Sequence, residues 1–167
     1  YQGGGLFSNF LFVLNHLIQA DKLGAIPVVD MENFTNLYNE KKKINGTYNS
    51  WLYYFDQVSP HTLSEVYKSK KVIFSSDKLF HKQSVSYKEN EKDLIKVYKK
   101  YVNIKKEFII EANKFIKKNF LKKKILAVHW RGSDHKVLPN HPFPPTEKQI
   151  LRMTDRLLLS KKFDKIF

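Results

Sequence analysis

Seven consecutive residues, 129–135, hold an arginine, a carboxylate, a hydroxyl and two imidazoles. A guanidinium can clamp a phosphate through two parallel hydrogen bonds and stays charged in a dry site. An imidazole or a carboxylate beside it can take up a proton during a reaction. The alternative is a polar turn in which Asp134 caps a backbone amide and Arg131 forms a structural ion pair. The spacing alone favours neither interpretation.

A second candidate segment lies near the start of the chain, where Gly3-Gly4-Gly5 precedes an apolar run. Glycines let a backbone approach a ligand closely, and the free amides at a helix start attract anions. The segment lacks the GxGxxG spacing of dinucleotide-binding loops, so an ordinary turn is the alternative. The sequence therefore indicates two places where an anion could bind.

The elements around these segments alternate between helices and strands. An apolar helix is predicted from about residue 9 to residue 23, with Ser8 or Asn9 at its start and Gly24 at its end. Short apolar runs predict strands at 25–30, 71–75, 125–130 and 163–167. This order predicts an α/β fold with an open sheet. The 129–135 segment would then lie beyond the carboxyl end of a strand, where such sheets bind ligands.

Two further helices are predicted in the second half of the chain. One runs from about residue 91 to residue 119, with a possible break near Asn103. The other begins at a capping box formed by Thr146 and Gln149 and ends near Leu159.

Charge and composition narrow the range of partners. The 167 residues carry a net charge of +14, and residues 91–124 contain twelve lysines and only four acidic residues. Apolar residues between these lysines predict one buried helix face and one solvated face, with a phosphate-binding surface as the alternative. Only three of the thirty basic residues are arginines: Arg131, Arg152 and Arg156. This composition disfavours a nucleic-acid partner, because proteins that read nucleic acids favour arginine.

The absence of certain residues and segments excludes further kinds of site and of protein. Without cysteine there is no disulfide scaffold, thiolate zinc site or cysteine nucleophile. No apolar run reaches the roughly 18 residues of a membrane span. The lysine-rich, cysteine-free composition favours a cytoplasmic location. The glycosylation sequons at Asn33 and Asn45 make the lumen of the Golgi or ER the alternative location.

The two candidate segments together resemble a known family. His129-Trp130-Arg131-Gly132-Ser133-Asp134 is similar to the His-x-Arg-x-(Ser/Thr)-Asp motif of the GDP-fucose-dependent fucosyltransferase superfamily, which includes α1,6-fucosyltransferases, nodulation-type enzymes and protein O-fucosyltransferases. Gly5-Leu6-Phe7-Ser8-Asn9 is similar to the family's amino-terminal glycine loop, and His141-Pro142 is similar to the segment after the family's arginine motif. The clear matches cover residues 3–30 and 125–142.

The resemblance implies a fold and a domain division. The fold would be a Rossmann-like three-layer open sheet, the amino-terminal half of a GT-B glycosyltransferase. Residues 1–162 would form this domain, and residues 163–167 would begin the carboxy-terminal nucleotide-binding domain. We therefore expect the chain to be a piece of a longer protein. The isolated piece would be inactive, because the other domain holds most guanosine contacts in the family.

The resemblance also implies a reaction, the inverting transfer of fucose from GDP-fucose to a glycan or protein hydroxyl, without a metal or cofactor. Arg131 would stabilise the leaving β-phosphate, and Asp134 and His135 are candidates for proton transfer. Substrate contacts would come from Gly4, Gly5, Asn9, His129, Ser133 and His141. Residues 136–145 lack the acidic residue that the α1,6 branch is thought to use as a base, which leaves the acceptor and subclass open.

Three rival interpretations stay open on the sequence. A related enzyme could use another sugar nucleotide, since the base contacts would lie in another domain. A basic module could bind a polyanion, either nucleic acid or an anionic glycan, through its lysine-rich helix. A pseudoenzyme could keep the fold and bind sugars without transferring them.

Overall fold

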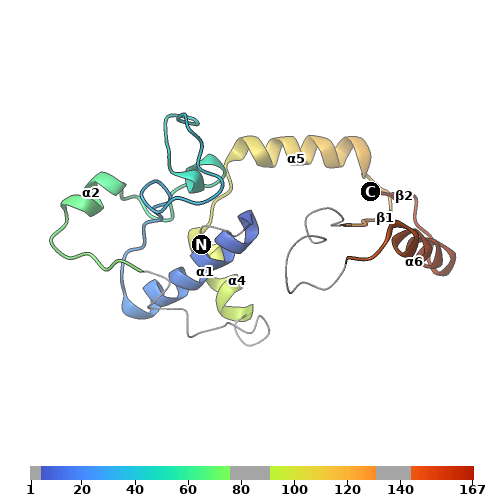
Figure 1. The fold of residues 1–167 in the computed structure, drawn as a ribbon, viewed down its shortest axis with the longest axis horizontal. Coiled ribbons are helices and arrows are strands. Elements are labelled where there is room, and N and C mark those ends of the chain that lie inside the picture. The colour runs from blue at the N-terminus through green and yellow to red at the C-terminus, as the bar shows by residue number, and fades with distance from the viewer. Residues whose placement is uncertain (1–4, 76–90, 131–143) are drawn as a thin grey trace. The chain divides into compact units, whose positions relative to one another are not determined.

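The structure, a computed structural model, describes residues 5–75, 91–130 and 144–167 (Figure 1). The chain forms two compact units, Tyr1–Ile109 and Ile110–Phe167. The domain boundary expected at residue 162 stays a prediction. No helix among the described residues combines the length and the apolar character needed to cross a membrane.

The central helix of the first unit is α1 (Leu6–Leu23). It ends as predicted at Gly24, whose φ of 62° lets the chain turn so that Ala25 N–H bonds Ala20 O at 2.9 Å. Its start differs from the prediction, because Gly5 occupies the N-cap position without a side-chain cap. Ser8 and Asn9 lie inside the helix, and Asn9 N–H bonds Gly5 O at 3.0 Å.

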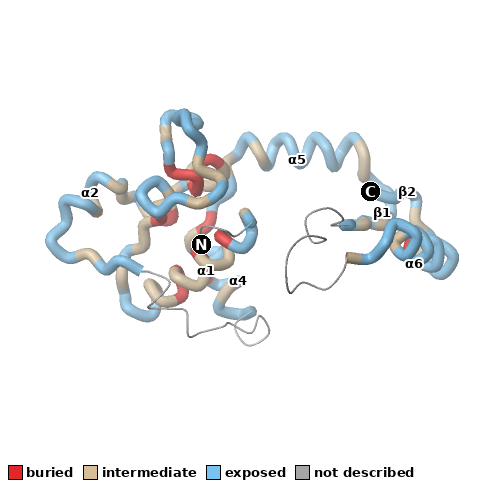
Figure 2. The backbone as a smooth tube through the Cα atoms, in the orientation of Figure 1, coloured by how far each residue is buried: buried red, intermediate tan, exposed pale blue. Residues whose placement is uncertain are grey.

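The core of the first unit lies where α1 packs against α4 (Glu91–Tyr101) (Figure 2). The faces in contact carry apolar residues at helical spacing, as the sequence predicts for both helices. Aromatic rings from the segment around the 3₁₀ helix η1 (Ser50–Tyr53) close the core, with Trp51 and Phe55 stacked at 4.4 Å between centroids. The buried apolar residues of this core are Val13, Leu14, Leu17, Ile18, Val29, Trp51, Val58, Val97 and Val102.

The strand predicted at 25–30 does not form. No strand pairing is found at these residues, and the backbone of Val29 bonds side-chain amides instead of a neighbouring strand. Val29 N–H donates to Gln57 Oε1 at 2.8 Å, and Val29 O accepts from Asn49 Nδ2 at 2.7 Å. The strand predicted at 71–75 is also wrong, because this segment follows the short helix α2 (Leu63–Lys68) as an irregular chain without a buried residue.

The long lysine-rich helix breaks near Asn103, as predicted. The first part is α4, and α5 (Lys106–Asn119) follows after a short connection. Two backbone bonds hold this connection in place: Asp56 N–H to Asn103 O at 2.9 Å and Lys105 N–H to Tyr54 O at 3.0 Å. The break therefore results from pairing with the segment after η1.

The second unit contains most of α5, followed by β1 (Ile125–Leu126), α6 (Glu147–Ser160) and β2 (Lys165–Ile166). The strands are parallel, with Ile125 opposite Lys165 and Leu126 opposite Ile166. The capping box predicted for α6 is confirmed, since Thr146 N–H donates to Gln149 Oε1 at 2.8 Å and Gln149 N–H to Thr146 Oγ1 at 3.3 Å.

These elements overturn the predicted fold class. About half of the described residues are helical, and these residues contain one sheet of two short strands. The expected α/β fold is therefore wrong, as is a Rossmann-like three-layer open sheet forming the amino-terminal half of a GT-B glycosyltransferase. The physical reason is that the apolar runs at 25–30 and 71–75 do not pair as strands. The run at 125–130 pairs as a strand over only two residues before His129 and Trp130 become exposed.

Candidate functional site

The arginine motif follows the carboxyl end of β1. His129 and Trp130 are exposed there and belong to the second unit. Six predicted site residues fall outside the described ranges, and their roles stay predictions: Gly4, Arg131, Ser133, Asp134, His135 and His141.

The residues on either side of the motif segment are tied together. Trp130 Nε1 donates a hydrogen bond to Pro145 O at 3.1 Å. On the β1 side, Val128 N–H donates to Phe167 O at 2.7 Å, which continues the backbone pairing beyond β1 to Val128, the residue before His129. On the other side, Thr146 caps α6. The described residues on either side of 131–143 therefore follow a parallel strand and precede a helix start, and helix starts favour anions.

The glycine segment belongs to the first unit, where Gly5 adopts an ordinary extended conformation. Its φ is −62°, and a Cβ built there would meet only Tyr38 Oη, at 3.8 Å. The same hydroxyl accepts a hydrogen bond from Leu6 N–H at 2.8 Å. An alanine would therefore fit at position 5, so the surroundings of this residue do not require a glycine.

Asn9, predicted to contact substrate, is 3% exposed and lines a small cavity beside α1. The cavity volume is about 10 Å³, which is room for one water molecule. A sugar nucleotide does not fit in such a space. Its lining surface is almost entirely apolar, and the lining residues are Leu6, Asn9, Phe10, Met31, Asn36, Tyr38, Ser50, Trp51 and Phe55.

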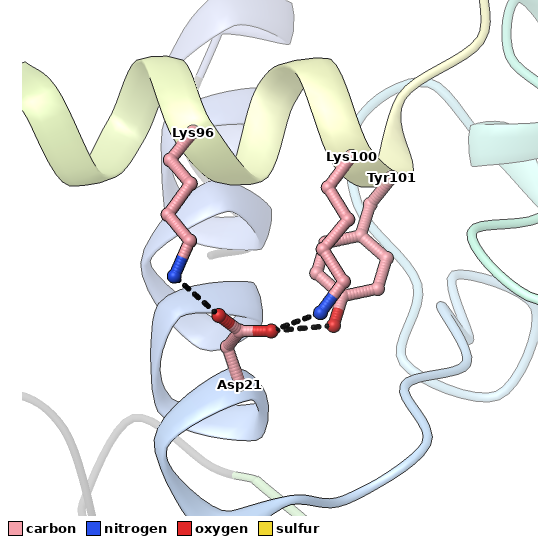
Figure 3. Close-up of polar contacts among 4 residues, drawn as sticks. All are labelled: Asp21, Lys96, Lys100 and Tyr101. Carbon is pink, nitrogen blue, oxygen red and sulfur yellow. Dashed lines mark hydrogen bonds and ion pairs between the residues drawn. The ribbon is translucent and has the colours of Figure 1, made fainter.

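A charged cluster that the sequence did not reveal joins α1 to α4 (Figure 3). Asp21 accepts from Lys96 Nζ at 3.1 Å, from Lys100 Nζ and from the Tyr101 hydroxyl at 2.9 Å. The hydrogen bond from Lys100 is the largest of the effects that hold the pKa of Asp21 well below its usual range. Asp21 in turn raises the pKa of Lys100. All four polar groups are used in holding the helices together, so we assign the cluster to stability.

Asp30, an acidic residue at the end of the segment predicted as a strand, also has a structural role. Its carboxylate accepts from the Tyr67 hydroxyl at 2.5 Å and from Asn33 N–H at 2.9 Å. Burial raises the pKa of Asp30, but hydrogen bonds from Asn33, Tyr67 and Glu32 outweigh it, so the pKa lies below its ordinary value. These bonds fix the turn after Asp30 and attach α2 to it.

The described residues offer no metal site, since they contain no group of three His, Cys, Asp or Glu residues that could hold an ion. The predicted metal-independence of the reaction stays a prediction.

Comparison with known proteins finds no match to this chain among family models, curated proteins or solved structures. The fucosyltransferase resemblance therefore depends on the motif residues alone.

Proposed function

We propose that this chain supplies the arginine motif of an inverting glycosyltransferase that moves fucose from GDP-fucose to a glycan or protein hydroxyl. The observation that supports the proposal most is where the motif lies in the chain. His129-Trp130-Arg131-Gly132-Ser133-Asp134 comes directly after β1, which pairs in parallel with β2. The motif is therefore bounded by a parallel strand pair before it and by the start of α6 after it, where the helix dipole favours an anion.

The bond between Trp130 and Pro145 gives further support. It ties the two sides of the motif segment together, at the end of β1 and just before the start of α6. The partial positive charge of a helix start favours a nearby anion such as a diphosphate. A guanidinium in the intervening segment would add full charge and two parallel donors.

In the proposed reaction, the acceptor oxygen forms a bond to C1 of fucose while the bond from C1 to the β-phosphate oxygen breaks. The electron pair of the broken bond leaves with GDP, and Arg131 stabilises the charge that develops there. The acceptor's proton passes to Asp134 or His135. Asp134 could instead orient Arg131, and then His135 would take the proton.

Nucleotide binding tests the role of Arg131. We expect the chain to bind GDP more tightly than GMP, because only GDP carries the β-phosphate. In Arg131→Ala, GDP affinity should fall about 10- to 100-fold, the usual effect of losing charge-assisted hydrogen bonds, and the preference over GMP should disappear. Titration calorimetry with both nucleotides measures this directly.

Arg152→Ala is the matched control, because Arg152 is exposed on α6 and its loss removes the same charge. It should leave both affinities within twofold of the parent chain. Equal losses in the two variants would mean that GDP binds through overall charge. If Arg131→Ala still preferred GDP over GMP to the same extent, the proposed role of Arg131 in binding the β-phosphate would be rejected.

A further inference from the structure

Two lysine runs far apart in sequence meet at the amino end of the strand pair. Lys122-Lys123-Lys124 precedes β1, and Lys161-Lys162 precedes β2, which begins with Lys165. Parallel pairing places the amino ends of the strands side by side, and Asp164 N–H bonds Lys124 O at 2.8 Å. The lysine patch consists of these six exposed residues: Lys122, Lys123, Lys124, Lys161, Lys162 and Lys165.

The lysine patch is poorly neutralised by its own segments. Residues 120–124 and 161–165 contain one acid, Asp164, and its carboxylate accepts from Lys124 N–H at 2.6 Å. The carboxyl ends of α5 and α6 lead into the patch, and cations are favourable near such helix ends. That effect extends over the last turn of each helix and does not account for a lysine inside β2.

Two exposed leucines accompany the lysines. Leu121, next to Lys122, is 59% exposed, and Leu159, two residues before Lys161, is 89% exposed. Both leucines are sequence neighbours of patch lysines, and exposed apolar side chains beside cations suit a partner with both anionic and apolar layers. A lipid bilayer has that arrangement, with phosphate groups above hydrocarbon.

We propose that the lysine patch, with Leu121 and Leu159, docks this unit onto the surface of an anionic lipid bilayer. The lysines would lie among the phosphates, and the leucines would enter the layer beneath them. A nucleic acid is the less favoured partner, because it offers no apolar layer to leucine and is usually read by arginine. The inference does not depend on the proposed transferase activity.

Vesicle co-sedimentation of the full chain tests the charge requirement. The probes are phosphatidylcholine vesicles that either lack anionic lipid or contain phosphatidylglycerol as about one lipid in three. We expect binding only to the anionic vesicles. Replacing Lys122, Lys123, Lys161 and Lys162 by glutamine should weaken binding at least tenfold, since each lysine near such a surface contributes about fivefold.

The matched control replaces four exposed lysines of the first unit by glutamine: Lys41, Lys42, Lys70 and Lys71. It removes the same charge and should weaken binding less than about threefold, because these lysines lie outside the patch. Equal losses in the two quadruple variants would overturn the proposal, since they would mean that net charge alone attracts the chain. Failure of the parent chain to bind anionic vesicles would overturn it as well.

A double substitution, Leu121→Ser with Leu159→Ser, tests the apolar part separately. Both side chains are exposed, so the fold should be kept, and circular dichroism verifies this. We expect at least a fivefold loss of vesicle binding, which persists when salt screens the lysines, because burying two leucines does not depend on charge. An unchanged vesicle affinity, or tighter binding to a duplex oligonucleotide than to vesicles at the same salt, would reject the bilayer as the partner.

Discussion

The two units of this chain bury their apolar residues to very different degrees. The first unit has a core in which Leu17, Trp51 and Val97 are each 2% exposed. In the described part of the second unit, Thr154 is the single buried residue. That unit is held by the parallel strand pair and by an aromatic group in which the rings of Phe120 and Phe167 lie 5.0 Å apart.

This difference indicates that the residues that stabilise the fold and the residues proposed to bind ligands lie in different units. The first unit has the burial that a cooperative fold requires, and its polar clusters at Asp21 and Asp30 serve internal contacts. The second unit carries the arginine motif and the lysine patch on a scaffold with little buried area. We therefore expect the second unit to open at lower free-energy cost than the first, as elements with few buried contacts do.

The largest expected effect comes from matched leucine truncations in the two units. Leu17→Ala should destabilise the first unit by about 2–5 kcal/mol, because it leaves a cavity in a closed core. Leu159→Ala should change stability by less than about 0.5 kcal/mol, because the side chain already lies in solvent. Urea denaturation of both variants gives the comparison.

The two tryptophans make this measurement specific to each unit. Trp51 is buried in the first unit and Trp130 is exposed in the second, so Leu17→Ala is measured in a Trp130→Phe background, which reports the first unit, and Leu159→Ala in a Trp51→Phe background, which reports the second. If Leu159→Ala shifted the urea midpoint as much as Leu17→Ala, the two units would not differ in how well their apolar side chains are buried.

The next largest effect is expected at Asn49, which is fully buried. Its side chain donates to Val29 O and accepts from Met31 N–H at 3.2 Å and Trp51 N–H at 3.2 Å. Asn49→Ala leaves these backbone groups without that partner and should cost about 2–4 kcal/mol, measured by the same urea denaturation.

Gln57→Ala provides the control, because Gln57 contacts the same Val29 backbone from a less buried position. Its cost should be smaller, about 1–2 kcal/mol. A neutral Asn49→Ala would show that residues 25–31 do not depend on side-chain amides for their conformation.

Asn49 also explains why the fold was only partly predictable. The existence of α1, α4, α5 and α6, the Gly24 end, the Asn103 break and the Thr146 capping box follow from local rules, and the structure confirms them, whereas the start of α1 and the short helix α2 were not predicted. The strand predicted at 25–30 failed because pairing depends on a partner far along the chain. An asparagine and a glutamine supplied the hydrogen bonds that a second strand would have made, and no local pattern reveals that choice.

The candidate site was predictable to a similar extent. The sequence located the arginine motif after a strand, and β1 does precede His129 and pair in parallel. It could not show that Asn9 would be buried beside a cavity the size of one water molecule, because the residues across from it come from distant segments. The lysine patch was missed because its two halves are adjacent only through the strand register.

A smaller effect is expected from removing the helix caps, one in each unit. Thr146→Ala removes the capping box of α6 and should cost about 1 kcal/mol locally. Hydrogen exchange should show α6 amides exchanging about fivefold faster, while α1 amides keep their protection. Thr62→Ala, which removes the equivalent capping box of α2, should leave α6 unchanged. Equal loss of protection in α1 and α6 after Thr146→Ala would mean that the units unfold together.

The smallest expected effect concerns the ion cluster between α1 and α4. Because its pKa is depressed in the folded chain, Asp21 contributes stability that is present above about pH 5 and is lost as the pH falls through its ordinary value near 4 and below. Asp21→Asn should lower the melting temperature at pH 7 by about 2–4 °C. The difference from the parent chain should shrink steadily toward pH 3.

Asp155→Asn is the control for this pH dependence, because Asp155 is an exposed acid on α6 in the other unit. It should leave the melting temperature unchanged from pH 7 to pH 3. If the effect of Asp21→Asn stayed constant across this range, the charge of Asp21 would not be what stabilises the helix pair. The ion pairs with Lys96 and Lys100 would then be ruled out as the main contribution, because protonation of Asp21 removes their attraction, whereas a hydrogen bond from the Tyr101 hydroxyl can be accepted by a carboxylate, a carboxylic acid or an asparagine amide.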